Sequence, residues 1–226
     1  MRAQLLLPLV ALAALLPPAA ASAADMPIQP GAQASSPVGG CTMNFVFDDQ
    51  DGTRYIAIAA HCINVGQRAS GSGVGEFGTC VWERFNGDDD FALIEIDALR
   101  LGQVNPAMRG WGGPTGYTVS TETLQGDVIL FHGFGLALGT TAVTRSRAGI
   151  LTGDTTRQYN AHGPISPGDS GGPVLHEATG KALGLANNTQ PPGSLAGGST
   201  IERLLEKAAE AGYILSLVTA PYTAPV

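Results

Sequence analysis

Positively charged residues are scarce in this sequence. Its 226 residues include 12 Lys and Arg against 19 Asp and Glu, for a formal net charge of −7, and the basic residues are scattered along the chain. Binding to nucleic acid requires clustered Lys and Arg that neutralise phosphates, and a membrane-surface helix requires a basic face. We therefore expect no nucleic-acid partner and no helix that lies on a membrane.

The beginning of the chain lacks an apolar run long enough to span a membrane. The apolar run Leu5 to Leu16 has 12 residues, whereas a spanning helix needs about 20. Arg2 precedes this run, and the small residues Ala21 and Ala23 follow it, which is typical of a cleaved signal peptide. The sequence predicts a signal peptide over residues 1–23 and a secreted, extracellular protein without a stable membrane anchor. The alternative is an N-terminal anchor.

Cysteine is also rare, with only Cys41, Cys62 and Cys80. An odd number allows one disulfide and leaves one thiol, and an exported protein enters an oxidising compartment in which a disulfide persists. The sequence contains no CxxC pair and its His residues are dispersed, so we expect no metal site.

Glycine and proline, in contrast, are abundant, with 31 and 15 residues. This amount of turn-forming sequence argues against a helical bundle or a coiled coil. The glycines follow no G-X-Y period, which excludes collagen, and a hydrophobic content of 44% is too high for a disordered chain. The composition indicates a compact, loop-rich protein.

Short alternating segments separated by turns predict mostly β structure. Arg54 to Ile58 alternates in this way, and Phe91 to Ile96 is apolar and β-branched enough for a buried strand. One helix is expected near the C-terminus, where Ser199 and Glu202 have the spacing of a capping box and Gly212 is a natural stop.

The most informative motif is Gly168-Asp169-Ser170-Gly171-Gly172-Pro173. A serine hydroxyl is a poor nucleophile unless a base lies beside it. Glycines around the serine let the backbone turn tightly and present N–H groups to a developing oxyanion. A glycine-rich surface turn is the alternative reading of this motif taken alone.

A candidate base and a candidate acid occur earlier in the chain. His61, in Ala59-Ala60-His61-Cys62, directly follows an alternating strand, and an imidazole suits proton transfer near neutral pH. Asp90 stands where an apolar strand begins, so its carboxylate can accept the N–H of the base. Asp88 and Asp89 are interpreted as a solvated acidic turn. Structural roles are expected for the remaining histidines, His132, His162 and His176.

These three motifs, in the order His, Asp, Ser, resemble the chymotrypsin-like serine peptidases. The short spacing from His61 to Asp90 is similar to that of the small bacterial secreted branch, which includes streptogrisin and α-lytic protease. The resemblance covers Cys41 to the C-terminal helix. It implies an all-β fold of two six-stranded antiparallel β-barrels followed by that helix.

The resemblance also implies how the chain is divided. Residues 24–40 are rich in Pro, Gly, Ala and Ser and have no periodicity, so we interpret them as a linker or a short pro-segment. A peptidase domain over residues 41–226 follows. It divides into an N-terminal barrel (about 41–98), a connection (about 99–116) and a C-terminal barrel with the helix (about 117–226).

The implied activity is that of a serine endopeptidase acting on peptides or proteins. Ser170 attacks the scissile carbonyl, His61 takes and returns the proton, and Asp90 orients His61. The backbone N–H groups of Gly168 and Ser170 form the oxyanion hole. The mechanism needs no cofactor, and we expect a monomer.

Two further pairings are carried over from the family. A Cys41–Cys62 disulfide pins the loop that carries the histidine, which leaves Cys80 as a buried and inert thiol. In the bacterial branch an internal Arg pairs with the Asp before the serine, and here Arg145 is the candidate partner of Asp169, with a solvated surface Arg as the alternative.

The specificity pocket is assigned by the same resemblance. In trypsin-like members an Asp six residues before the serine binds basic side chains, but here that position is Pro164, followed by Ile165. The opposite wall is assigned to Ala186, Asn187 and Asn188. We therefore expect a small or apolar P1 side chain rather than Arg or Lys.

Two other functions compete with this prediction. The segment around Ser170 also fits G-x-S-x-G, the nucleophile turn of α/β-hydrolases, but that fold places its acid and histidine after the serine, where only His176 follows. The second alternative is a peptidase-like binding module without turnover. Such modules commonly lose a triad member, whereas all three candidates are present here.

Overall fold

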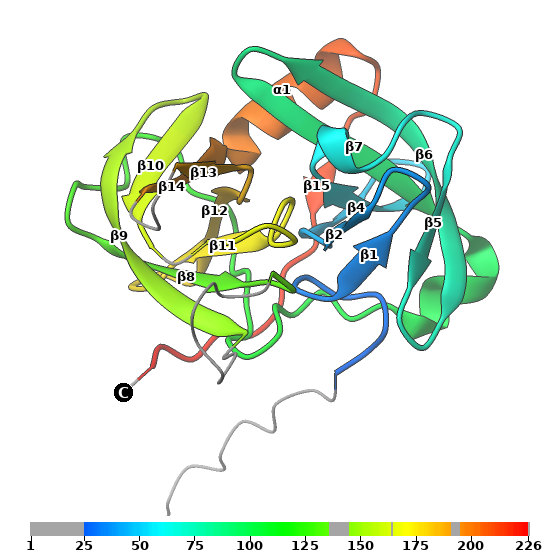
Figure 1. Ribbon diagram of the computed structural model, residues 1–226, viewed down its shortest axis with the longest axis horizontal. Helices are drawn as coiled ribbons and strands as arrows, with labels where there is room; N and C mark the ends of the chain where they lie inside the picture. Colours follow the sequence, from blue (N-terminus) through cyan, green and yellow to red (C-terminus); the bar gives the residue numbers. More distant parts are fainter. Residues whose placement is uncertain (1–24, 136–144, 164, 191–194, 226) are drawn as a thin grey trace, which may run out of the picture.

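The computed structural model describes residues 25–135, 145–163, 165–190 and 195–225. Two antiparallel β-sheets account for most of the regular structure of these residues, and they lie side by side with one helix near their junction (Figure 1). The predicted signal peptide, residues 1–23, lies outside the described part of the chain. No helix within the described part has the length and apolar character needed to cross a membrane.

The first sheet contains eight strands in the order β15-β3-β4-β7-β6-β5-β1-β2. Its strands are β1 (Gln33–Ser35), β2 (Gly40–Thr42), β3 (Val46–Asp48), β4 (Arg54–Ile58), β5 (Arg68–Gly71), β6 (Gly75–Asn86), β7 (Asp89–Ile96) and β15 (Ser216–Leu217). Two 3₁₀ turns follow strands of this sheet, η1 (Ala60–Cys62) after β4 and η2 (Ala98–Gln103) after β7.

The second sheet contains seven strands in the order β12-β11-β8-β9-β10-β14-β13. Its strands are β8 (Val128–His132), β9 (Ser146–Asp154), β10 (Gln158–His162), β11 (Pro173–His176), β12 (Lys181–Leu185), β13 (Asn188–Gln190) and β14 (Leu195–Ser199). The helix α1 (Ile201–Glu210) directly follows β14. The predicted arrangement of two antiparallel barrels and a C-terminal helix is confirmed.

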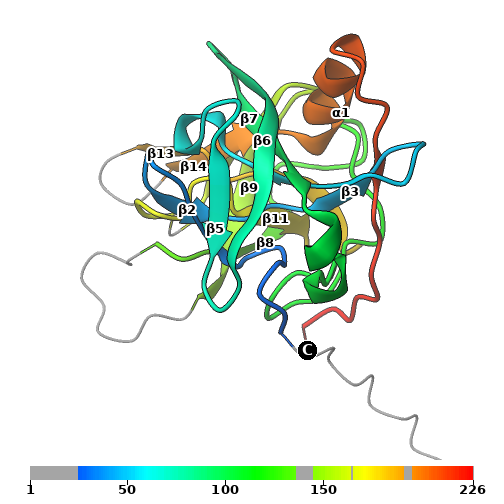
Figure 2. The ribbon, with the colours of Figure 1, turned by 90° about the vertical axis from the view of Figure 1, so that its right-hand side faces the viewer.

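The number of strands differs from the prediction of six in each barrel, because short segments pair at the sheet edges. At one edge of the first sheet β15 pairs with β3 through Ser216↔Asp48 and Leu217↔Phe47. This segment comes from the end of the chain, which the prediction assigned wholly to the C-terminal barrel. Figure 2 shows it returning past β3. Such pairing satisfies backbone groups that an open edge would leave to solvent.

Residues 26–40 pack against the first half and contribute β1 and the start of β2 to its sheet, and they are not the linker that their composition predicted. Ile28 is fully buried, and the Gln29 side chain donates to the Ala107 carbonyl at 2.8 Å. In β1, Ala34 lies opposite both Cys41 of β2 and Gly71 of β5. A short strand is held in a sheet by its main-chain hydrogen bonds and does not need an alternating pattern, so a Pro- and Gly-rich segment can still be built into a sheet.

Three clusters of buried apolar side chains form the core of the protein and join its two halves. One lies inside each sheet, and a third, which includes Phe45, Leu93 and Leu175, joins both sheets to the helix. In α1, Ile201, Leu204 and Ala208 are buried, as their helical spacing predicted. The helix therefore binds the second half to the first, close to the start of β7 (Figure 1).

The helix begins one residue later than its capping-box spacing predicted. Thr200 is the N-cap, and its hydroxyl accepts from the Arg203 N–H at 3.1 Å. The hydroxyl of Ser199, the predicted cap, instead donates to the Asp88 carbonyl at 3.2 Å. Because its hydroxyl does not cap the helix, Ser199 can donate to the carbonyl of Asp88, which directly precedes β7 of the first sheet.

Candidate active site

His61 lies in the η1 turn that ends strand β4. Ile56 to Ala60 are all buried, whereas His61 itself is exposed, with 37% of its side-chain surface accessible. The buried strand therefore anchors the turn, and the turn directs the imidazole into the region between the two sheets.

Asp90 lies beside His61 because β7 pairs with β4, with Ile58 opposite Ala92. Asp90 Oδ2 is 2.7 Å from His61 Nδ1, and Asp90 Oδ1 accepts from the His61 backbone N–H at 3.0 Å. A carboxylate can only accept, so Nδ1 carries the hydrogen and Nε2 is left as the basic nitrogen. The bond from Asp90 raises the pKa of His61 above its ordinary value, against the opposite effect of burial.

Ser170 lies in a tight turn between β10 and β11 that packs on the first half. Its carbonyl accepts from the Thr42 N–H at 2.9 Å, and the Asn44 amide donates to the Gly171 carbonyl at 2.8 Å. Gly171 has φ +84°, and a Cβ there would lie 2.7 Å from the backbone nitrogen of Ala59. Only glycine therefore allows this turn to approach the segment that carries His61.

Some polar groups of this turn form no hydrogen bond within the described part of the chain. Neither the Ser170 hydroxyl nor the backbone N–H groups of Gly168 and Ser170 make a hydrogen bond with a described residue. Gly168 has φ +97°, and its carbonyl is held by the Thr42 hydroxyl at 2.8 Å. The turn thus presents one hydroxyl and two N–H donors that have no partner among the residues that the structure describes.

Asp169 pairs with Arg147 and not with Arg145 as predicted. Arg147 Nη1 and Nη2 lie 2.7 and 2.6 Å from the two Asp169 oxygens, and both side chains are buried. Arg145 precedes β9 and stacks on the ring of Phe134 at 3.9 Å. The two arginines are two residues apart, so alternation places them on the same face and cannot select between them.

Backbone N–H groups provide further hydrogen bonds to the Asp169 carboxylate. Oδ1 accepts from the Gly135 N–H at 2.7 Å, and Oδ2 accepts from the Ser166 N–H at 2.8 Å. Each oxygen therefore has an arginine donor and a backbone donor, which a buried carboxylate requires. This shell fixes the residue between Gly168 and Ser170.

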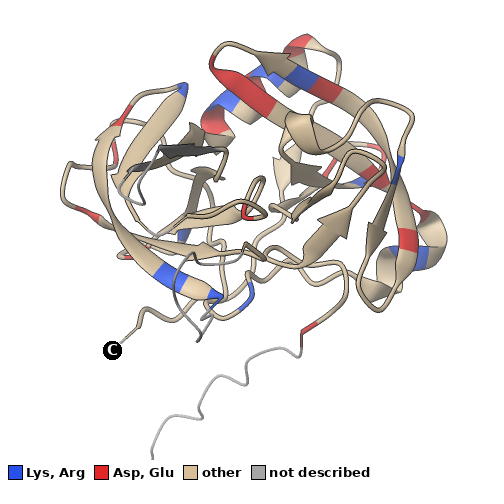
Figure 3. Ribbon diagram, in the orientation of Figure 1, with Lys and Arg blue, Asp and Glu red and all other residues tan. Residues whose placement is uncertain are grey.

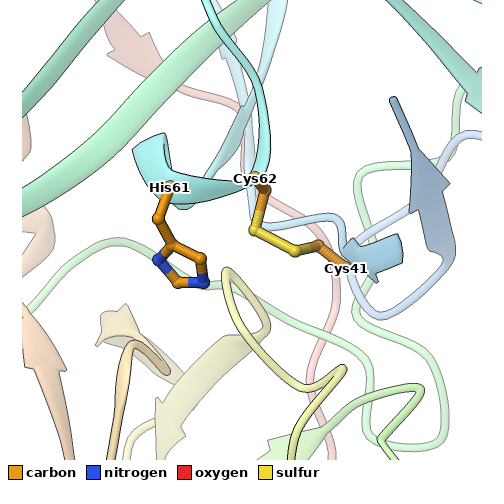
Figure 4. Close-up of side chains that lie close together, drawn as sticks. All are labelled: Cys41, His61 and Cys62. Atoms are coloured by element: carbon orange, nitrogen blue, oxygen red, sulfur yellow. A yellow bond between two sulfur atoms is a disulfide. The ribbon is translucent and has the colours of Figure 1, made fainter. Parts of the chain in front are cut away.

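The Cys41–Cys62 disulfide is present and lies next to His61 (Figure 4). Its sulfurs and a His61 nitrogen all lie within 4.8 Å of one another. Because each sulfur is bonded to the other, neither is available as a thiolate ligand for a metal ion. The bridge joins η1 to β2, and the chain-entropy treatment gives a loop of this size about 3 kcal/mol of stabilisation.

Cys80 is the free cysteine, and it is 1% exposed in β6. Burial and the nearby Glu83 raise the pKa of its thiol to about 11. The thiolate is the reactive form, and at pH 8 it is then about 0.1% of the population. We expect iodoacetamide at pH 8 to leave Cys80 unmodified in the native protein and to modify it in guanidinium chloride, as mass spectrometry would report. Rapid modification of the native protein would contradict this burial.

The predicted pocket residues have different environments. Pro164 lies outside the described residues, Ile165 packs against the apolar core of the second sheet, and Ala186 is buried. Asn188 lies in β13, where its backbone pairs with Gly197. Asn187 contacts a different partner, since its Nδ2 donates to the Asp90 carbonyl at 2.6 Å.

Asp89 is buried, with 2% of its surface exposed, and not in a solvated turn as predicted. Its carboxylate binds Arg203 of α1, with Nε to Oδ1 at 2.8 Å, and Arg84 of β6. Strand β7 begins at Asp89, so Asp89 and Asp90 point to opposite faces of the sheet. A prediction that began this strand at Asp89, two residues before Phe91, would have placed the Asp89 and Asp90 side chains on opposite faces.

Two of the other histidines, His132 and His176, have structural partners, as the sequence predicted. His132 Nδ1 lies 2.9 Å from the Ser146 hydroxyl, and burial lowers the pKa of His132 to about 4. His176 lies in β11, where its two ring nitrogens contact Asp127 and Thr179. The antiparallel sheets also exclude the α/β-hydrolase fold, which is built on parallel βαβ units.

Comparisons with known proteins address the fold. No protein-family model matches the sequence, and no curated protein matches it. Among solved structures, Thermobifida fusca protease A is 21% identical, with a TM-score of 0.65 and coverage of 85% of this chain and 98% of its own. Cellulomonas bogoriensis chymotrypsin and Nocardiopsis protease are 18% and 16% identical, with TM-scores of 0.59 and 0.61, and each match covers 84% of this chain and 98% of theirs. The chain therefore has the fold of the bacterial chymotrypsin-like serine proteases.

Proposed function

We propose that this chain is a secreted serine endopeptidase that cleaves peptide bonds through an acyl-enzyme. The observation that carries the proposal is the contact of 2.7 Å between His61 Nδ1 and Asp90, beside the turn that carries Ser170. The fold of known proteases supports the same assignment. Acyl transfer requires an exposed base such as His61, a serine hydroxyl and two N–H donors, and those of this turn have no partner within the described part of the chain.

The proposed reaction uses these groups in sequence. His61 Nε2 takes the Ser170 proton as Oγ attacks the scissile carbonyl, and Asp90 stabilises the imidazolium that forms. The N–H groups of Gly168 and Ser170 bind the oxyanion. The intermediate then collapses to an acyl-enzyme as His61 protonates the leaving amine. Water, activated by His61, hydrolyses the ester and regenerates Ser170.

We propose a small or apolar P1 side chain, with Ile165 and Ala186 as apolar wall residues. Ile165 packs on the second core, and Ala186 joins the Ser170 turn because its carbonyl accepts from the Gly171 N–H at 2.8 Å. Substrates would be peptides or proteins, the enzyme would act as a monomer, and the mechanism needs no cofactor. Secretion through a signal peptide over residues 1–23 is part of the proposal, and the disulfide supports it.

Labelling with a fluorophosphonate tests this proposal. Such a probe phosphonylates a serine only when a base activates it, so we expect one adduct, and peptide mapping should locate it on Ser170. The labelling rate should fall in acid with a midpoint above pH 6.5, because His61 must be neutral to act and Asp90 raises its pKa.

The same experiment separates the alternatives. A labelled serine other than Ser170, or a rate that is flat from pH 5 to 8, would overturn the proposed nucleophile or base. A folded protein that neither reacts with the probe nor cleaves any member of a peptide library would be a binding module instead. The library also reports the P1 preference directly.

A further inference from the structure

The start of β7 is held by side chains of the second half of the fold. Asn187 donates to the Asp90 carbonyl at 2.6 Å. Ser199 and Gln158 donate to the Asp88 carbonyl at 3.2 and 3.0 Å. The backbone on both sides of Asp89 is therefore attached to residues that lie far away in the sequence and belong to the second half of the fold.

Asp89 adds a charged attachment at the centre of this segment. Arg203 of α1 donates to it through Nε at 2.8 Å and Nη2 at 3.1 Å, and Arg84 donates from β6. Figure 3 shows the acidic start of β7 next to basic residues of the helix. Burial raises the pKa of Asp89, but the bonds from the two arginines outweigh it and lower the pKa, so the carboxylate stays charged. A buried charge with these partners resists displacement.

Asp90 reaches His61 from this same segment. Its two carboxylate contacts, 2.7 Å to Nδ1 and 3.0 Å to the backbone N–H, need a backbone that stays within a fraction of an ångström of its position. The β6–β7 ladder of the first sheet pairs Asp90 with Phe85, and the second half, which also carries Ser170, adds the side-chain donors to the carbonyls of Asp88 and Asp90.

We propose that Arg203 and Asn187 are positioning residues, which hold Asp90 against His61 by fixing the backbone of residues 88–90 from the second half. The inference rests on the proposed function. It gives Arg203 of the helix, and Asn187 between β12 and β13, a role in catalysis without contact to a substrate. The acid of the triad is then correctly placed only when the two halves are docked.

Two variants test this role, Arg203→Met and Asn187→Ala. We expect kcat to fall about tenfold to a hundredfold with KM nearly unchanged, because the reacting groups and not the substrate contacts are displaced. The pKa of His61, measured by NMR in a Ser170→Ala background, should fall towards or below 6.5, since Asp90 is the charged group that raises it among the described residues.

Arg54→Met is the matched control. Arg54 makes a bidentate ion pair with Asp48 in the same sheet, with contacts of 2.6 and 2.7 Å, at strands that do not carry Asp90. This control should leave kcat and the His61 pKa unchanged. A merely structural role for Arg203 and Asn187 would lower stability without moving the pKa of His61.

The outcomes are distinct. Folded variants that keep both the wild-type kcat and the wild-type His61 pKa overturn the inference. If Arg203→Met does not fold, the Asn187→Ala variant tests the inference by itself. It removes one amide and leaves no buried charge without a partner, so we expect it to fold. If the wild type has no activity, the proposed function fails, whereas the NMR titration still shows whether these residues position Asp90.

Discussion

Replacing Ser170 with alanine is expected to lower kcat for peptide hydrolysis by about 10⁴- to 10⁶-fold. The hydroxyl is the proposed nucleophile, and no acyl-enzyme forms without it. Residual rate should remain from the oxyanion donors and from substrate binding, because the alanine methyl group leaves the turn intact. The measurement is steady-state hydrolysis of a chromogenic peptide with a small or apolar P1 residue.

Ser72→Ala is the control for this prediction. Ser72 is an exposed serine in the turn between β5 and β6, so the same chemical change is made away from the site. Its kcat should equal that of the wild type. A Ser170→Ala protein that kept a tenth of the wild-type activity would assign the nucleophile to another residue.

Replacing Arg147 with methionine is expected to destabilise the protein by about 3–5 kcal/mol. The substitution keeps much of the side-chain volume but leaves the buried Asp169 carboxylate without its two guanidinium bonds. The midpoint of urea unfolding should fall with little change in slope. Labelling of Ser170 should slow as well, because Asp169 separates the two proposed oxyanion donors.

Arg145→Met distinguishes this pairing from the one that the sequence predicted. Arg145 stacks on Phe134, and losing such a contact costs about 1 kcal/mol or less. If Arg145→Met were the more destabilising of the two variants, the assignment of Arg147 as the partner of Asp169 would be wrong.

Much of the fold could be predicted because its signals are local. Alternation identified β4, an apolar and β-branched run identified β7, and helical spacing identified the buried face of α1. The short strands β1 and β15 could not be predicted in this way, since they are held by main-chain pairing and are too short to carry a pattern of their own.

The sequence by itself determined which chemical groups are available at the candidate site. A glycine-flanked serine, a histidine after a strand and an aspartate at the mouth of another strand are local features, because each depends on the conformation of a few adjacent residues. The positive φ of Gly171 is an example, since the need for glycine follows from the turn itself.

Only the tertiary structure decided which partners these groups have. Asp89 and Arg203 are separated by 114 positions, and Asn187 and Asp90 by 97. Alternation shows which face of a strand a side chain occupies, but not what packs against that face. The burial of Asp89, the choice of Arg147 over Arg145 and the contact of Asn187 with Asp90 therefore follow from how the two sheets and the helix pack.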